Sequence, residues 1–231
     1  MIDIEYQLKK SPRRRTISIH IHPDCSIRVL APSSLADEQV STYVDSKRRW
    51  IEAKIACFRA SRHLYLPKQY VNGSSFDYLG HHYRLKIISG DGRVRLMSGR
   101  FLVPVPETLP QSDHAPFIRQ QLSNWYAEHA LSRMQEKTLE YAKRLDCYPG
   151  PVAVKGYRSR WGCCFADGRI IYNWRLIMAP VRVIDYVIVH ELAHLKQRNH
   201  SKRFYNEVGS VVPDYKDQRQ WLRHNGHHLQ V

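Results

Sequence analysis

The feature that most constrains the fold is an apolar run that leads directly into two histidines and a glutamate. Residues 183–189 read Val-Ile-Asp-Tyr-Val-Ile-Val, and His190, Glu191 and His194 follow in the pattern H-E-x-x-H. The apolar run is typical of a buried helix, which opens at Pro180. Charged or polar side chains carried into the interior on such a helix need a partner or a metal ion. The sequence therefore predicts an interior helix that presents these three side chains.

The spacing within this motif predicts a metal site. Residues four apart on a helix lie about 40° apart around its axis, so the imidazoles of His190 and His194 can bind one ion. Glu191 points about 100° away from His190, and its carboxylate can reach a water on the metal instead of the metal itself. A catalytic zinc lowers the pKa of such a water towards about 7, and the carboxylate accepts the proton. The pattern indicates a hydrolytic zinc site with Glu191 as general base. The alternative is an amphipathic core helix with solvated histidines.

The third metal ligand is expected from the segment after the helix, because a catalytic zinc takes three protein ligands and keeps one position open. His200 follows His194 by six residues and can turn back to the metal if the helix ends after about Lys196. Asn199 is the expected left-handed residue of that turn, since asparagine tolerates positive φ. The five cysteines are odd in number and form no C-x-x-C pair, so histidine must supply the zinc ligands.

The remainder of the chain predicts an α+β protein. The expected strands, which alternate apolar and polar residues or are bounded by glycine and proline, are 15–22, 26–30, 76–79, 83–88, 100–105, 152–154 and 169–174. The expected helices are 32 to about 62, about 115 to 145, the motif helix from 180, and 214–222. The buried stripe of the first is expected to include Tyr43, Trp50 and Ile51, and that of the second Leu139. Four prolines between Val103 and Phe117 mark a boundary. We therefore expect an N-terminal β-rich subdomain over 1–105 and a core over 113–231.

The charge balance indicates a polyanionic partner. The chain carries 36 Lys and Arg against 21 Asp and Glu, a net charge of +15, with basic clusters at 9–15, 47–49 and 196–203. DNA or another polyanion bound through its phosphates would explain this excess, although a soluble basic surface would also produce it. The N-terminus does not read as a signal peptide, and no apolar run approaches the roughly 20 residues of a membrane span. A cytoplasmic protein without membrane contact is expected.

Several separate runs together carry a family resemblance. They are Tyr157 to Cys164 (YRSRWGCC), Ile171 to Leu176 (IYNWRL), Asp185 to His194, and Asn199-His200-Ser201 with Phe204. In these runs the chain closely resembles the YgjP-like metallopeptidases, relatives of the WLM and SprT-like zincins. That family usually reads S-R-W-G-S-C, whereas Cys163 stands here in place of the serine. The resemblance implies a zincin-like core, made of a small sheet, the H-E-x-x-H helix and a second helix behind it. It also implies a Zn2+ cofactor and a peptide or protein substrate.

The resemblance also bears on the substrate cleft. In zincins an edge strand beside the active-site helix commonly binds substrate, so residues 170–174 are expected to do so, with Asn173 and Arg160 near the cleft. The alternative is that Trp161 and Trp174 are core packing and that Arg160 pairs with a structural carboxylate. An oxyanion stabiliser is expected on general grounds, and three side chains are candidates. They are Tyr205, Tyr215 and His224.

Two functions from different classes follow. The first is a zinc-dependent metallopeptidase with ligands His190, His194 and His200 and the base Glu191, acting on peptide bonds and on nucleic-acid-associated proteins, because related SprT-like and WLM proteins act on proteins attached to DNA. The second is a nucleic-acid-binding protein with a structural zinc and no proteolytic activity. That alternative requires a fourth protein ligand, such as His224 or a cysteine.

Overall fold

The computed structural model describes residues 4–22, 24–60 and 68–231, and the chain forms two compact units, Met1–Pro67 and Lys68–Val231. We call them unit 1 and unit 2. The sequence predicts a boundary in the proline-rich stretch after Val103, whereas the structure divides the chain before Lys68. The reason is that the strands between 75 and 105 pack against the long helix of unit 2, a contact that local sequence patterns do not reveal.

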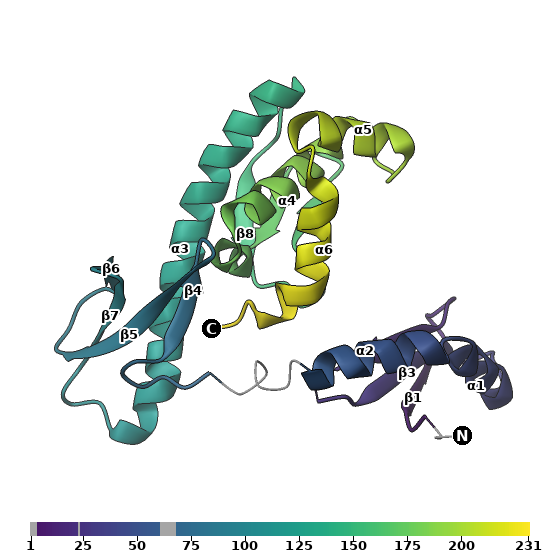
Figure 1. Ribbon diagram of the computed structural model, residues 1–231, viewed down its shortest axis with the longest axis horizontal. Helices are drawn as coiled ribbons and strands as arrows, with labels where there is room; N and C mark the ends of the chain where they lie inside the picture. The colour runs from purple at the N-terminus through teal and green to yellow at the C-terminus, as the bar shows by residue number, and fades with distance from the viewer. Residues whose placement is uncertain (1–3, 23, 61–67) are drawn as a thin grey trace. The chain divides into compact units, whose positions relative to one another are not determined.

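Unit 1 is a three-stranded sheet with two helices on one face (Figure 1). The strands β1 (Gln7–Ser11) and β2 (Ser18–Ile21) flank β3 (Ile27–Pro32). β2 and β3, which correspond to the predicted strands 15–22 and 26–30, are antiparallel. β1, which the sequence did not predict, pairs parallel with β3. The buried apolar side chains between the sheet and the helices are Ile27, Val29, Ala31, Val40, Val44 and Ile51.

The helical layer of unit 1 differs from the single helix that the sequence predicts. The chain forms α1 (Asp37–Ser46) and α2 (Arg48–Ala60), which are separated at Lys47. The predicted end near Arg62 lies outside the described residues. Tyr43 and Trp50, which the sequence places on the buried stripe, are 37% and 51% exposed. Ile51, which the sequence places on the same stripe, is fully buried together with Val40 and Val44.

Unit 2 begins with a four-stranded sheet that packs on one helix. The strand order is β4-β5-β7-β6, formed by Ser75–Tyr78, His81–Ser89, Arg100–Val105 and Arg95–Met97 respectively. The long helix α3 (Gln111–Leu145) covers this sheet: the rings of Phe101 and Trp125 meet edge to face at 5.0 Å. The hydroxyl of Tyr126 donates a hydrogen bond to the carbonyl of Asp77, at 2.7 Å. These contacts attach residues 75–105 to the rest of unit 2.

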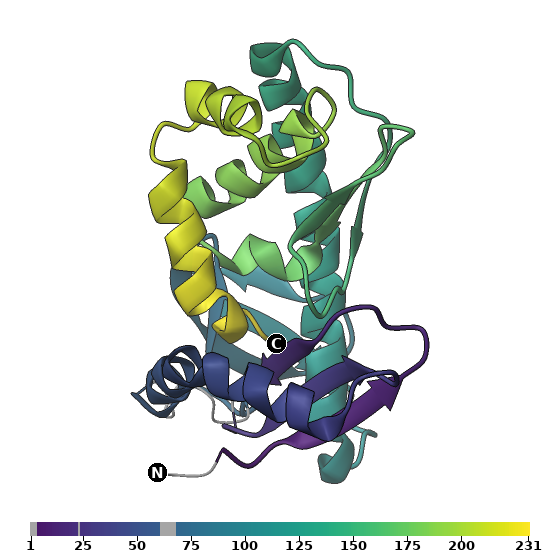
Figure 2. The same ribbon diagram turned by 90° about the vertical axis from the view of Figure 1, so that its right-hand side faces the viewer.

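The second half of unit 2 contains a three-stranded sheet and three helices. The strands β8 (Val152–Lys155), β10 (Ile170–Asn173) and β9 (Gly162–Cys164) lie in that order, with β10 parallel to β8 and antiparallel to β9. A 3-10 turn, η2 (Trp174–Met178), leads into α4 (Val181–Ala193), which is followed by α5 (Lys202–Val211), α6 (Tyr215–Asn225) and η3 (Gly226–His228). Figure 2 shows α4 between the small sheet on one side and α6, in yellow, on the other.

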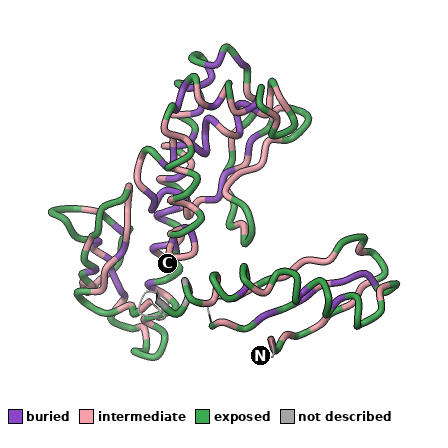
Figure 3. The backbone as a smooth tube through the Cα atoms, turned by 45° about the vertical axis from the view of Figure 1, so that its right-hand side comes forward, coloured by how far each residue is buried: buried purple, intermediate pink, exposed green. Residues whose placement is uncertain are grey.

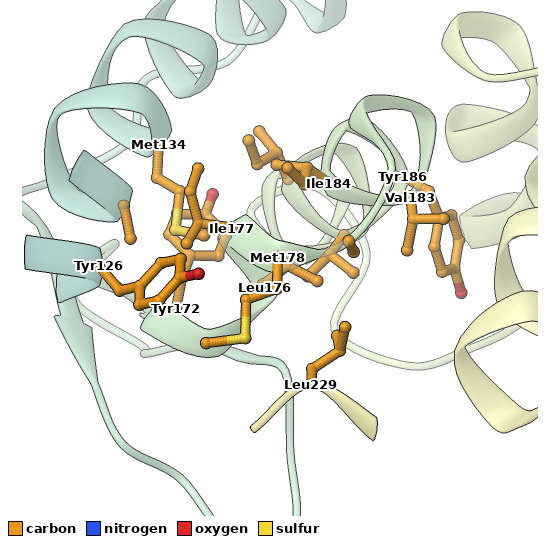
Figure 4. Packing of buried hydrophobic residues seen from close by; sticks show 14 of the residues in the cluster. Tyr126, Met134, Tyr172, Leu176, Ile177, Met178, Val183, Ile184, Tyr186 and Leu229 are labelled. Atoms are coloured by element: carbon orange, nitrogen blue, oxygen red, sulfur yellow. The ribbon is translucent and has the colours of Figure 1, made fainter. Parts of the chain in front are cut away.

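The core of unit 2 lies where α3, α4, η2 and β10 meet. Buried residues follow these elements through the interior of the unit (Figure 3). Tyr126 and Met134 of α3 approach Tyr172 of β10 and Ile177 of η2, and Ile184 of α4 lies close by (Figure 4). These side chains join α4 to α3, and the C-terminal end of α4, which packs against β9 and α5, carries the H-E-x-x-H motif.

Several elements of unit 2 differ from the sequence-based predictions. α3 begins at Gln111, four residues before the predicted start, and contains Pro116. Leu139, predicted as a core residue of this helix, is 63% exposed. The sequence predicts neither β6, β9 nor α5. Among the described residues, none of the helices combines the length and the apolar character that a bilayer span requires.

Candidate metal centre

The helix α4 places the H-E-x-x-H motif at the edge of the core. Its apolar residues from Val183 to Val189 are buried, as the sequence predicts, and so is Glu191 of the motif itself. α4 ends at Ala193, about three residues earlier than predicted, and His194 is the C-cap residue. Because the last helical turn carries the motif, its side chains lie where the chain emerges from the interior.

The chain reverses directly after His194 and brings His200 back towards α4. The amide of Gln197 donates to the carbonyl of Ala193 at 2.9 Å, which continues the helix as a tight turn. The sequence predicts a left-handed Asn199 at this reversal; that prediction is wrong, because Asn199 is not among the described residues with positive φ. α5 then begins at once, with the hydroxyl of Ser201 accepting a hydrogen bond from the Phe204 amide.

The three predicted metal ligands lie together. One nitrogen from each of His190, His194 and His200 falls within 4.8 Å of the others. The Nε2 atoms of His190 and His200 are 3.1 Å apart. Two ligands at about 2.05 Å from a tetrahedral zinc would be about 3.3 Å apart, so this separation suits the ion. Nδ1 of His194 hydrogen-bonds to the Gln197 carbonyl at 3.1 Å, which leaves Nε2 for the metal. The residues present therefore fit a zinc ion.

The surroundings of the histidines favour their neutral, metal-binding form. Burial, together with the neighbouring imidazoles of His194 and His200, lowers the pKa of His190 to about 3. Burial likewise lowers the pKa of His194. The ring of Phe204, which is fully buried on α5, lies 4.9, 4.6 and 4.8 Å from the rings of these three histidines in that order. Phe204 thus supplies the apolar wall of the site.

Glu191 is held against the strand β9. Its carboxylate is buried with 6% of the residue exposed, and a hydrogen bond from the backbone amide of Cys164 fixes it. Burial raises the pKa of Glu191 to about 7, although the Cys164 amide and the charge of Arg160 oppose the shift. A Cβ atom on Gly162 would lie only 2.5 Å from Oε1 of Glu191. Sequence reasoning did not assign a role to Gly162, because a glycine before a strand carries no signal of what its missing side chain would meet.

A cleft of about 490 Å³ opens onto the three histidines and Glu191. One wall is the segment from Gly162 to Ala166, and the other is α4 with the loop that follows it. The described residues that line the cleft include two arginines, Arg160 and Arg198, and one carboxylate, that of Glu191. Once the imidazoles hold a cation, the cleft is positively charged.

The structure decides between the predictions for the substrate strand. Residues 170–174 were predicted to add a substrate strand; that prediction is wrong for β10, because β10 has a neighbouring strand on each side. β9 is the edge strand beside α4 instead. Arg160 lines the cleft as predicted. Asn173 is 3% exposed and does not line the cleft; its side-chain amide donates to the carbonyls of Tyr157 and Arg160, at 2.9 and 3.1 Å.

The indoles and the candidate oxyanion residues have mainly structural surroundings. Trp161 packs on Gly226, where a Cβ atom would lie 2.7 Å from the indole ring, and Trp174 packs against the core. Tyr205 stacks on Tyr215, with ring centroids 5.4 Å apart. Neither tyrosine, nor His224, is among the described residues that line the cleft. Tyr205 comes nearest, with its ring 6.2 Å from the ring of His200.

Comparison with known proteins identifies the family. A family model described as "YgjP-like, metallopeptidase domain" matches residues 15–225. The chain belongs to this YgjP-like family. The match covers both compact units, so the family is defined by more than the H-E-x-x-H helix.

Two individual proteins show local similarity to this YgjP-like chain. Over 48 residues it is 42% identical to a UTP pyrophosphatase of Escherichia coli (strain K12), a match that covers 19% of this chain and 29% of that protein. The chain thus matches less than a third of the length of this curated relative. The crystal structure of the metallopeptidase zymogen of Pyrococcus abyssi abylysin aligns with a TM-score of 0.33 at 23% identity, over 39% of this chain and 93% of that one. A TM-score this low does not establish a common fold.

Proposed function

We propose that this protein is a zinc-dependent metallopeptidase that hydrolyses peptide bonds with Glu191 as general base. The observation that carries the proposal is that one nitrogen from each of three imidazoles lies within 4.8 Å of the others, beside a buried carboxylate in one cleft. Three histidine ligands are also the set that leaves a catalytic zinc one open position. Membership of a metallopeptidase family supports the same chemistry. A zincin-like core, with β8–β10 and α4 at its centre and α3 behind, forms part of this proposal.

Each residue of the site has a defined task in this mechanism. His190, His194 and His200 hold the zinc, which when bound acts as a Lewis acid and lowers the pKa of a water towards about 7. The carboxylate of Glu191 accepts a proton from the attacking water and then donates it to the leaving amine. Burial raises the pKa of this carboxyl group, which favours both transfers because a general base works best when its pKa is near the working pH. The Cys164 amide and the bare Cα of Gly162 keep the carboxylate in place.

The substrate would bind along β9. This strand is at the edge of its sheet and lines the cleft, so an extended peptide can pair with its backbone groups, apart from the Cys164 amide that Glu191 occupies. Arg160 and Arg198 favour a substrate that is acidic near the scissile bond. Nucleic-acid-associated proteins remain part of the proposal because of the net charge of +15.

The alternative of a structural zinc in a nucleic-acid-binding protein is less well supported. A structural site needs four protein ligands. Within the described residues, the group that could hold a metal at this position contains three histidines and no fourth ligand. His224, a candidate for that role, is exposed and its Nδ1 hydrogen-bonds to the carbonyl of Gln220.

A second candidate function is hydrolysis of a nucleoside triphosphate. The observation in its favour is the pair of guanidinium groups, Arg160 and Arg198, on a cleft with one carboxylate among its described lining residues. Arginine binds phosphate through paired hydrogen bonds, and the relative that aligns with this chain over 48 residues is a UTP pyrophosphatase. In this case the same metal-activated water would attack a phosphoanhydride instead of a carbonyl carbon.

The test is zinc analysis combined with two activity assays, for unfolded protein substrate with and without DNA and for pyrophosphate release from UTP. For the wild type we expect one zinc per chain and an activity that a chelator abolishes. Glu191→Gln is expected to retain zinc and to lose about 10²- to 10⁴-fold in rate, the usual contribution of a general base. Purified protein that binds no zinc would refute the proposal. Turnover of UTP without proteolysis would select the second function.

A further inference from the structure

The sheet of unit 1 has one face covered by helices and one face open. Leu8, Val29 and Ile19 belong to the apolar cluster of the unit and are neighbours in the strand register. Figure 1 shows α1 and α2 on one side of the sheet. The alternate residues of the three strands point the other way, and no described helix of unit 1 covers them. A sheet of this size normally leaves one face in solvent, so the open face by itself indicates nothing. Its chemistry is what indicates a ligand.

The strand register arranges the open side chains in two rows. Arg28 of β3 lies between Gln7 of β1 and His20 of β2. Two residues further along the strands, about 7 Å away, Leu30 lies between Lys9 and Ser18. Neighbours within a row are about 5 Å apart. We call these six residues the open sheet face.

The loop between β1 and β2 adds further cations to this face. Nη1 of Arg14 donates a hydrogen bond to the hydroxyl of Ser18 at 3.0 Å, which brings the guanidinium onto the face. Arg13 and Arg15 on either side are exposed. The six residues include no carboxylate; the nearest in sequence is Glu5, two residues before Gln7.

The charge of unit 1 is concentrated in its sheet layer. Residues 4–32 contain six Lys or Arg and two Asp or Glu, a net charge of +4. The helical layer, residues 37–60, contains five Lys or Arg and four Asp or Glu, a net charge of +1. One of the six sheet-layer cations, Lys10, is already paired with Asp37 of α1 at 2.5 Å. A surface made merely for solubility mixes both signs, whereas the six residues of the open sheet face include Lys9 and Arg28 and no carboxylate.

We propose that the open sheet face binds duplex nucleic acid through its phosphate backbone. Cations at this spacing, without carboxylates among them, match a dense line of phosphates. The face has no phenylalanine, tyrosine or tryptophan on which the bases of a single strand could stack, so a duplex is favoured over single-stranded nucleic acid. Binding here requires neither zinc nor Glu191, and the proposal does not depend on the activity of the metal centre.

The experiment measures binding of the full-length protein to a fluorescent DNA duplex of about 20 base pairs by anisotropy, from about 50 to 200 mM salt. The test variant is Lys9→Gln/Arg28→Gln, which removes two charges from the open sheet face. The matched control is Lys47→Gln/Arg49→Gln, which removes the same charge from the helical layer. Each phosphate contact contributes about 0.9 to the slope of log affinity against log salt. We therefore expect the test variant to lose about 2 from this slope and to bind more than tenfold more weakly at about 0.1 M salt.

The control variant is expected to change the slope by less than half as much. Equal effects of the two variants would overturn the proposal, since general charge would then suffice. Stronger binding of a single strand, or displacement of the duplex by an equal charge of polyglutamate, would also overturn it. If the test variant unfolds in a thermal melt, Arg13→Gln/Arg15→Gln in the exposed loop replaces it with the same expected direction. Protein stripped of metal by a chelator and the Glu191→Gln variant are both expected to bind DNA like the wild type. Failure of the proposed activity can therefore be distinguished from failure of DNA binding.

Discussion

Replacing Gly162 by alanine tests whether the strand β9 positions the general base. The change adds one methyl group at a place where its carbon would lie 2.5 Å from Oε1, 2.6 Å from Cγ and 2.7 Å from Cδ of Glu191. Gly162 is not among the glycines with positive φ, so alanine fits the backbone conformation. The substitution therefore acts through this one contact.

The size of the effect follows from the contact distance. Two non-bonded carbon or oxygen atoms approach to about 3.5 Å, so the carboxylate must retreat by about 1 Å. A displacement of about 1 Å from the reactive position reduces the rate about 100-fold, or about 2.7 kcal/mol in the barrier. Overpacking of a buried site also lowers the free energy of unfolding by about 1–3 kcal/mol. The histidines are untouched, so zinc content is expected to stay at the wild-type level.

The assay compares kcat/KM on an unfolded protein substrate, zinc content and thermal unfolding for Gly162→Ala and a control. The control is Gly209→Ala on α5, where the added Cβ would meet the Tyr215 ring at an ordinary 3.5 Å. Alanine there is expected to leave kcat/KM unchanged and to stabilise the helix by up to about 1 kcal/mol. Wild-type turnover by Gly162→Ala would refute the argument that Glu191 acts from the position it has in the structure. Loss of zinc from this variant would show instead that the whole site had collapsed.

Two further predictions concern the third ligand and the loop before β9. His200→Ala is expected to weaken zinc binding at least tenfold in competition with a chromophoric chelator. His224→Ala, which removes an imidazole that hydrogen-bonds to Gln220 of its own helix, is expected to leave zinc binding unchanged. Equal effects of the two substitutions would contradict the three-histidine site. Asn173→Ala leaves the carbonyls of Tyr157 and Arg160 without their donor and is expected to lower the free energy of unfolding in urea by about 1–3 kcal/mol, with zinc binding retained. A fully stable Asn173→Ala protein would show that water replaces the amide.

The residues of the site that could be predicted from sequence are those whose spacing along one helix, or a short turn after it, fixes their positions. His190, Glu191 and His194 share one helix, whose spacing fixes their relative directions, and His200 is close enough in the chain for a short turn to return it. The means of that turn was not predictable, because a tight turn after a helix can form without a left-handed residue. The prediction of Asn199 in that conformation failed for this reason.

The parts that escaped prediction depend on contacts between distant segments. Gly162-Cys163-Cys164 has none of the alternation of a strand and becomes one only because Ile170 to Tyr172 pairs with it. β1 was likewise not predicted, because its two lysines hide the apolar alternation of a strand, and it forms by pairing with β3. The unit boundary was misplaced because prolines mark where an element stops, whereas the boundary depends on which elements pack together, as Phe101 and Trp125 do.

The cleft is built from one short stretch of the chain. Every side chain that lines it falls between Arg160 and His200, and unit 1 supplies none of them among the described residues. A centre encoded so compactly in sequence forms through short-range loop closures, which are fast and lose little chain entropy. It can also be inherited as a block: natural variation in the N-terminal unit would change what the protein associates with while leaving the reaction chemistry intact.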